Sequence, residues 1–210
     1  MKNKKLDTRR MATLAMLAGL LLAMSMTGIG FIPLPIIKAT TMHIPVILGA
    51  VLLGPTAGAF LGAVFGICSI WANTVTPGLL SFAFSPFMTN EGFIGVVKSL
   101  WISLGCRILL GAMAGWLWKG MKASKSHDFV ALPVTAALAS IFHSLIVMAS
   151  IGILLAQQYA EVKNVGMTAV LGTAMLTVVT SGIPEAIAAV LLVTVIGKAL
   201  LKLLERMKKH

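Results

Sequence analysis

Apolar runs about as long as a bilayer is thick recur along the whole chain, and they constrain its fold more than any other feature. A helix needs about 20 consecutive apolar residues to cross a membrane. The chain is 58% hydrophobic and only 11% charged, whereas a soluble domain has about 25% charged residues. The sequence therefore predicts an all-α integral membrane protein with six transmembrane helices. We expect one membrane domain over residues 1–210, with spans at about 11–32, 44–54, 56–72, 98–118, 129–156 and 167–196.

The first two runs need separate arguments. The first follows a basic N-terminal segment, as a signal peptide does, but it is longer than the about 7–15 apolar residues of a signal sequence. We therefore interpret it as a retained helix. The second run, IPVILGAVLLG, is short for a span. It either begins inside the preceding connection, PLPIIKATTMH, or forms a tilted helix that its neighbours shield.

The positive charges lie at the ends of the apolar runs, which indicates membrane orientation rather than nucleic-acid binding. The net charge is +11, but no basic and aromatic surface of the kind that binds nucleic acid is evident. Cytoplasmic loops carry an excess of Lys and Arg. With six spans, both basic termini share a side with the loop KGMKASKSHD, and the other side receives only Lys38, Lys98 and Lys163. The sequence predicts cytoplasmic termini and an outward-facing loop at 73–97.

Small residues recur at every fourth position on two predicted helices. The entry turn and body of the third span carry Gly54, Gly58, Gly62 and Gly66. Such stripes let helix backbones approach closely in lipid. We favour packing within the chain for these glycines, with a contact to a partner subunit as the alternative. The first span carries Ala15, Gly19 and Ala23, and here both internal packing and docking onto another membrane protein stay open.

Arg107 lies near the middle of the apolar run SLWISLGCRILLGAMAGWL. A charge at that depth costs at least roughly 2.5–3.5 kcal/mol on insertion scales. Ser103 and Gly111 share its helix face, so we expect this face to point into the bundle. A guanidinium binds a carboxylate through two parallel hydrogen bonds. Arg107 therefore forms either an anion site open to the outside, or a buried ion pair or carbonyl clamp. Glu185, the carboxylate inside a predicted span, is the candidate partner for an ion pair.

Signatures of catalysis are missing from the sequence. It has no G-x-x-x-x-G-K-[ST] loop for ATP and no H-E-x-x-H motif, and its four histidines lack the short spacing of metal ligands. We expect no enzymatic activity, no metal and no cofactor. The fifth span instead carries a polar seam that includes His143 and Ser144, in which His143 is either a ligand contact or a hydrogen-bonded packing residue. The long loop at 73–97 has the length and composition of a lid.

Three segments resemble the substrate-binding S components of energy-coupling factor (ECF) vitamin importers. They read TMHIPVILGAVLLGPTAGAFLGAVFG, SFAFSP and CRILLGAMAG, and the resemblance covers essentially the whole chain. The block HIPVILGAVLLGP is most similar to the pantothenate-type S component. The resemblance implies a subunit of the cell membrane that binds a vitamin from outside. It also implies docking on a transmembrane coupling protein driven by two ATPase subunits, after which the subunit topples and releases the vitamin inside.

The resemblance also implies roles for particular residues. The family docks through an Ala-x-x-x-Ala motif on the first helix, and here Ala15-x-x-x-Gly19, continuing to Ala23, is the nearest match. Glycine departs from the motif but keeps the surface small. A pantothenate ligand needs one cation, several neutral polar partners and an apolar wall. The residues that fit these needs are Arg107, Asn73, His143, Ser144, Trp71 and Phe82.

Three other functions stay open at this point. The chain fits an S component for another small vitamin or precursor, a membrane scaffold subunit that transports nothing, or a carrier that works alone. Ligand that purifies with the isolated chain would separate a binding subunit from a scaffold. Uptake by the chain alone in liposomes would favour the carrier.

Overall fold

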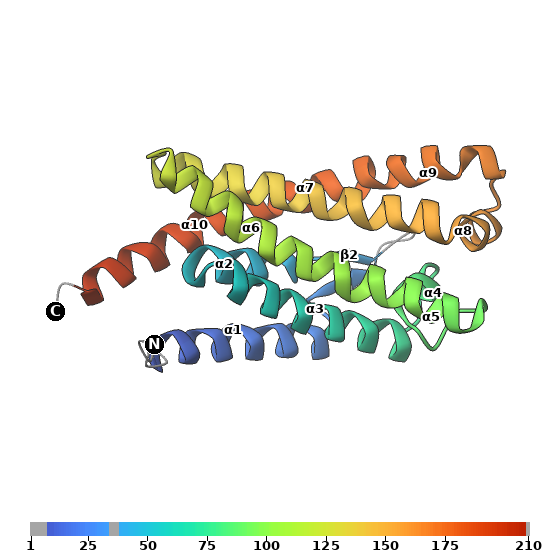
Figure 1. Cartoon of the computed structure of the whole chain (residues 1–210), viewed down its shortest axis with the longest axis horizontal. Coiled ribbons are helices and arrows are strands. Elements are labelled where there is room, and N and C mark those ends of the chain that lie inside the picture. The colour runs from blue at the N-terminus through green and yellow to red at the C-terminus, as the bar shows by residue number, and fades with distance from the viewer. Residues whose placement is uncertain (1–7, 34–37, 209–210) are drawn as a thin grey trace, which may run out of the picture.

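The computed structural model of the chain describes residues 8–33 and 38–208, which form a bundle of helices along one long axis (Figure 1). The longer helices are α1 (Thr8–Met26), α2 (His43–Leu53), α3 (Pro55–Val75), α6 (Cys106–Ala123), α7 (Asp128–Leu154) and α10 (Ile183–Lys208). Shorter ones are α4 (Ser81–Phe84), α5 (Gly92–Leu100), α8 (Ala156–Lys163) and α9 (Val170–Thr177). A 3₁₀ turn, η2 (Met167–Ala169), precedes α9, and π-helical turns η1 (Trp101–Gly105) and η3 (Val178–Gly182) join α5 to α6 and α9 to α10.

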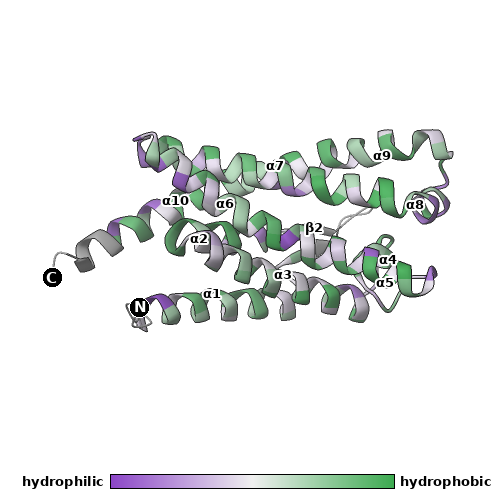
Figure 2. Ribbon diagram, in the orientation of Figure 1, coloured by the Kyte–Doolittle hydropathy of each residue, from purple (hydrophilic) through white to green (hydrophobic). Residues whose placement is uncertain are grey.

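Apolar helices dominate the bundle, as Figure 2 shows by hydropathy. Within the described residues, five helical segments are long and apolar enough to cross a membrane. They are Thr8–Met26, Pro55–Val75, Gly92–Ala123, Asp128–Leu154 and Met167–Leu203. These segments support a multi-pass membrane protein. Helix α2 has 11 residues, or about 16 Å at about 1.5 Å per residue, so it is too short to cross alone. Its residues from His43 to Val51 are all buried.

The chain between α1 and α2 differs from the prediction of an all-α fold. Helix α1 ends at Met26, before the predicted limit at residue 32, and Gly28 follows with a φ of 75°. Strands β1 (Phe31–Pro33) and β2 (Lys38–Thr40) then pair antiparallel, with Phe31 opposite Thr40. Glycine adopts a positive φ without strain, and proline cannot continue a helix. These residues therefore end the span early and start an extended hairpin.

The glycine stripe packs helix α3 directly against helix α6, which confirms the interpretation of packing within the chain. A Cβ atom added at Gly58 would overlap the carbonyl oxygen of Gly111, and one at Gly62 would overlap that of Arg107. At Gly66 it would lie 2.8 Å from the carbonyl oxygen of Ser103. The two backbones are in contact because no side chain separates them.

Two clusters of buried apolar side chains fill the bundle. One gathers residues of α2, α3 and α10 with the C-terminal half of α6, including Phe65 and Leu110. The other gathers the N-terminal end of α6 with α8, α9 and the C-terminal half of α7, including Ile102 and Tyr159. The start of α1 and the end of α10 lie at one end of the molecule, while α4, α5 and α8 lie at the other (Figure 1).

Candidate functional site

A cavity of about 230 Å³ lies where the two apolar clusters meet. Phe31 of the first cluster and Leu80, Val147 and Met148 of the second all line it. The hairpin, α3, the segment 77–84, α6, α7 and the η3–α10 junction each contribute to its wall. The polar side chains in the wall belong to Thr40, Ser69, Asn73, Arg107, His143, Ser144, Thr177, Ser181 and Glu185. The cavity therefore combines a cation, a carboxylate and several neutral polar groups with an apolar lining.

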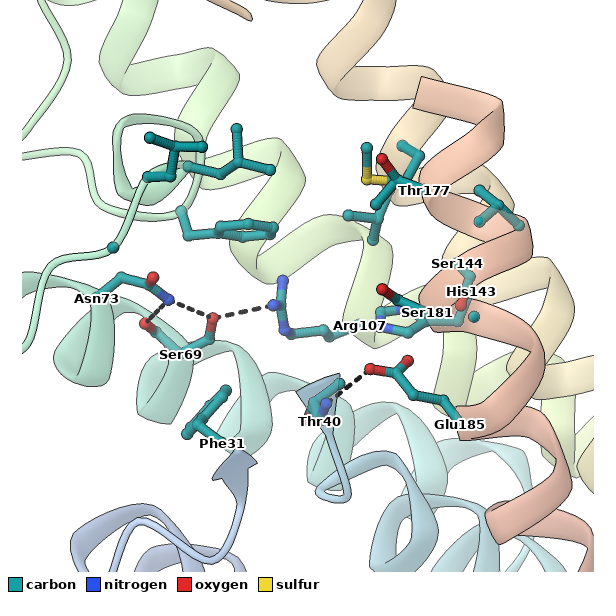
Figure 3. Close-up of a pocket in the computed structure, with 18 of the residues that line it drawn as sticks. Phe31, Thr40, Ser69, Asn73, Arg107, His143, Ser144, Thr177, Ser181 and Glu185 are labelled. Carbon is teal, nitrogen blue, oxygen red and sulfur yellow. Dashed lines mark hydrogen bonds between the residues drawn. The ribbon is translucent and has the colours of Figure 1, made fainter. Parts of the chain in front are cut away.

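Arg107 supplies the cation and is 4% exposed. Its Nη1 donates to the carbonyl oxygens of Ile102 and Ser103, both at 2.9 Å, and its Nη2 donates to Ser69 Oγ at 2.9 Å. Its Nε is buried and has no hydrogen-bond partner among the described residues. Figure 3 shows the guanidinium extended toward Ser69. A buried charge held by neutral acceptors alone keeps its full positive charge available to a ligand.

Two aromatic rings fix the position of the guanidinium further. The Arg107 Cζ lies 4.7 Å from the centroid of the Phe65 ring and 5.2 Å from that of the Phe84 ring. A cation over a ring face is attracted by the ring quadrupole, most strongly where water is excluded. The side chain is therefore held in place before any ligand arrives.

A chain of hydrogen bonds joins Arg107 to the segment 77–84, which lines the cavity. Ser69 Oγ also accepts from Asn73 Nδ2 at 3.4 Å, and Asn73 Oδ1 accepts from Ser81 Oγ at 2.9 Å. Ser81 Oγ in turn accepts from the Gly78 N–H at 2.7 Å. Because Gly78 and Leu80 line the cavity, Asn73 links the segment 77–84 to Ser69, which holds Arg107.

Glu185 supplies the carboxylate and lies in the first turn of α10. Its Oε1 accepts from the Thr40 N–H at 2.7 Å. The structure shows no ion pair between Glu185 and Arg107: within the described residues the ion pairs are Lys98–Glu91 and Lys122–Asp128. The buried pair considered from the sequence is therefore not formed. Its members instead line one cavity separately (Figure 3).

Both charged residues closely follow a π-helical turn. Arg107 follows η1 and Glu185 follows η3, each within the first three residues of the next α-helix. A π-helical turn inside an α-helix is rare and frequently marks a functional site. In η1 it also places two carbonyl oxygens, of Ile102 and Ser103, within reach of the Arg107 side chain.

The structure brings four of the six predicted binding residues to the cavity, namely Arg107, Asn73, His143 and Ser144. His143 is buried, with its ring centroid 6.0 Å from that of Phe65, and its Nδ1 has no hydrogen-bond partner in the described part of the chain. The Asn73 amide lines the cavity, but its own polar atoms already bond to Ser69 and Ser81.

The other two predicted residues, Trp71 and Phe82, do not line the cavity. Trp71 is 61% exposed on the outer surface of α3. The backbone carbonyl of Phe82 accepts from Ser99 Oγ, so Phe82 helps to fix the segment 77–84 to α5. Phe84 and Phe31 provide the aromatic wall instead. Sequence reasoning missed Phe31 and Thr40 because it placed Phe31 at the end of the first span and assigned no structure to the connection that contains Thr40.

The small residues of α1 do not pack inside the chain. Ala15, Gly19 and Ala23 are all exposed, and a Cβ added at Gly19 would meet no atom within 4 Å. The opposite side of the helix carries the buried Leu21. The described residues therefore do not show internal packing of this stripe. The face of α1 that carries Ala15, Gly19 and Ala23 is exposed.

Most of the chain is similar to known membrane transport proteins. The sequence model of the family described as "ECF transporter, substrate-specific component" matches residues 9–197. The chain is 32% identical over 171 residues to the pantothenic acid transporter PanT of Lactococcus lactis, covering 81% of each chain. It is 26% identical over 199 residues to the pantothenate transporter PanT of Leuconostoc mesenteroides, covering 90% of each. The family match spans every element that builds the cavity, and the chain therefore belongs to the substrate-specific components of ECF transporters.

Proposed function

We propose that this chain binds pantothenate from outside the cell and delivers it to an ECF module for import. The observation that carries the proposal is Arg107, a buried guanidinium in a cavity, with no carboxylate of the described chain paired to it. Its position supports a ligand that brings its own carboxylate. Two relatives named as pantothenate transporters support the identity of that ligand.

The remaining chemistry of the cavity suits the rest of the molecule. Pantothenate has a carboxylate, an amide, two hydroxyls and a gem-dimethyl group. Val147, Met148 and Leu80 offer an apolar surface for the methyl groups, while Ser144 and Ser181 offer hydroxyls. The volume of about 230 Å³ is below the about 300–1,000 Å³ of sites for drug-sized ligands. This favours a small vitamin over a larger one such as folate.

We infer that the partners are a transmembrane coupling protein and two ATPase subunits. The sequence lacks the phosphate-binding loop of P-loop ATPases, which agrees with ATP hydrolysis by separate subunits. The exposed face of Ala15, Gly19 and Ala23 supports a contact in which a second helix backbone approaches closely. In this scheme the chain acts by binding and movement and catalyses no reaction.

We infer further that six crossings place both termini in the cytoplasm. Five described segments have the length of a span, and α2 together with the hairpin that precedes it makes the sixth crossing. The distribution of lysines and arginines supports this orientation, because six crossings assign the basic N-terminal sequence, the loop after α6 and the basic C-terminal sequence to one side. The cavity wall formed by segment 77–84 then faces the outside.

One experiment on the purified chain tests the function. We expect isothermal titration with pantothenate to show binding without any ATPase subunit, and mass spectrometry of extracted small molecules to find the vitamin in unwashed protein. Liposomes that hold the chain alone should accumulate no pantothenate, and those that also hold the coupling protein and ATPases should. Uptake by the chain alone would indicate a carrier. Absence of any bound small molecule and of any titration signal would indicate a scaffold.

A further inference from the structure

The carboxylate of Glu185 has one oxygen that the protein leaves unused. Oε1 accepts from the Thr40 N–H at 2.7 Å, but Oε2 has no hydrogen-bond partner among the described residues. An ionised carboxylate can accept about four hydrogen bonds. A charged residue inside a membrane span is costly and marks a functional site by default. The single hydrogen bond to the hairpin therefore uses only one of the acceptor positions of this carboxylate.

Arg107 does not neutralise this carboxylate. Every hydrogen bond of the guanidinium goes to Ser69, Ile102 or Ser103, and the two side chains form no ion pair. The cavity thus has a cationic group and an anionic group at separate places in its wall (Figure 3). A ligand that satisfies both must carry an acceptor at one end and hydrogen-bond donors at the other.

Two serine hydroxyls line the cavity near Glu185 (Figure 3). Ser181 precedes Glu185 by four residues and lines the same cavity, as does Ser144 of α7. The two helices approach closely here, because a Cβ added at Gly182 would lie 2.9 Å from the Ser144 Cβ. This region offers acceptors and small hydroxyls but no cation, so it suits a polyol and repels a second acidic group.

We propose that Glu185 binds the hydroxyl end of the substrate and thereby sets the direction in which it enters the cavity. The inference rests on the proposed function and adds a residue to it. The substrate carboxylate lies at Arg107, and a substrate hydroxyl donates to the free Oε2 of Glu185. Hydrogen bonds from a hydroxyl to a carboxylate are short and roughly twice as strong as those between neutral groups. Glu185 is in this account a specificity-determining residue, which rejects ligands that have an acid at both ends.

The experiment compares pantothenate with an analogue whose primary hydroxyl is replaced by hydrogen. Affinities are measured by calorimetry on the purified chain and on Glu185→Gln. In the variant, the amide oxygen can keep the bond from Thr40 N–H, so that an amide nitrogen replaces the free Oε2. We expect the wild type to prefer pantothenate by about 10- to 150-fold, the range for a hydrogen bond to a charged group. The preference should fall to about tenfold or less in Glu185→Gln.

Glu161→Gln is the matched control. It makes the same substitution at an exposed glutamate of α8 that does not line the cavity, so its preference should stay within about threefold of the wild-type value. If Glu185→Gln keeps the full preference, or if Glu161→Gln loses it as well, the inference is wrong. A wild-type chain that binds no pantothenate at all would overturn the proposed function, and this inference with it.

Discussion

Gly62 of α3 lies directly against the backbone carbonyl of Arg107 of α6, so that the residue holding the cation rests on a helix contact with no side chain between. A Cβ at Gly62 would overlap the Arg107 carbonyl oxygen. The π-helical turn η1, which leads into α6, supplies two carbonyl oxygens that accept from the guanidinium. The position of the cation in the cavity is therefore fixed by close packing of two helices and not by an ion pair.

Gly62→Ala should destabilise the protein and weaken ligand binding together. Forcing a methyl group into a close contact costs typically about 1–3 kcal/mol, and here the group that must move is the backbone of Arg107. Thermal unfolding in detergent and calorimetric titration would measure the two effects. Gly172→Ala on α9 is the control, because a Cβ there meets no atom within 4 Å. A Gly62→Ala protein with wild-type melting temperature and affinity would contradict the packing argument.

The absence of an ion pair between Arg107 and Glu185 leads to a second prediction. If the two formed a structural pair, the double variant Arg107→Ala/Glu185→Gln would recover both folding and binding, because neither charge would be stranded. We expect instead that the folded double variant fails to bind pantothenate. Circular dichroism and size-exclusion chromatography would establish folding, and calorimetry would measure binding. Near-normal affinity in the double variant would remove Arg107 from the binding site.

Gly19→Leu should block import and leave ligand binding intact. Gly19 is exposed and a Cβ added there meets no atom of the described chain within 4 Å, so the isolated subunit should fold and bind. A leucine would nevertheless hold a partner helix away from the small face of α1. Uptake into vesicles with the complete module and titration of the isolated subunit measure the two properties.

Gly172→Leu provides the matched control for this third prediction. It makes the same substitution at an exposed glycine on α9 that also has open space around it. We expect Gly172→Leu to keep import. Loss of import in both variants, or loss of pantothenate binding in Gly19→Leu, would show that the face of α1 is not the docking surface.

The fourth prediction concerns orientation. Asn90 and Ser124 are both exposed and lie toward opposite ends of the bundle, before α5 and after α6. The native cysteines, Cys68 and Cys106, are buried and should give little background. A membrane-impermeant thiol reagent applied to intact cells should label Asn90→Cys and spare Ser124→Cys until the cells are permeabilised. The reverse pattern would mean that the termini face outward.

The sequence alone predicted the apolar spans, the close helix contact of the glycine stripe and the importance of Arg107, because each follows from a single physical constraint. The length of the apolar runs indicates spans, and the spacing of Gly58, Gly62 and Gly66 indicates a close helix contact, which the structure confirms. Arg107 was conspicuous because a buried charge is costly. Four of the predicted binding residues line the cavity for the same reason, since polar groups on apolar helices turn toward one another.

Other features depended on contacts that no local pattern reveals. The hairpin that brings Phe31 and Thr40 to the cavity is a consequence of proline and glycine in a connection whose fold is set by its neighbours. Phe84 replaces Phe82 in the wall because a single turn of helix, α4, sets which side chain faces inward. Whether Glu185 pairs with Arg107 depended on a distance between two helices, and the sequence contains no measure of it.

The central claim is that Arg107 meets the carboxylate of the substrate, and the most direct test varies the residue and the ligand group together. Calorimetry would compare pantothenate with the analogue that has an alcohol in place of the carboxylate, on the wild type, Arg107→Lys and Arg107→Ala. We expect Arg107→Ala to lose about 30-fold to several-thousand-fold in affinity for pantothenate, the range for truncating one member of a buried pair. Arg107→Lys should lose less, because it keeps the charge but not the bidentate geometry. The alcohol analogue should bind the wild type weakly, and its affinity for Arg107→Ala should be about the same as for the wild type. An equal loss for both ligands would contradict the claim, because it would show that Arg107 shapes the cavity without contacting the carboxylate.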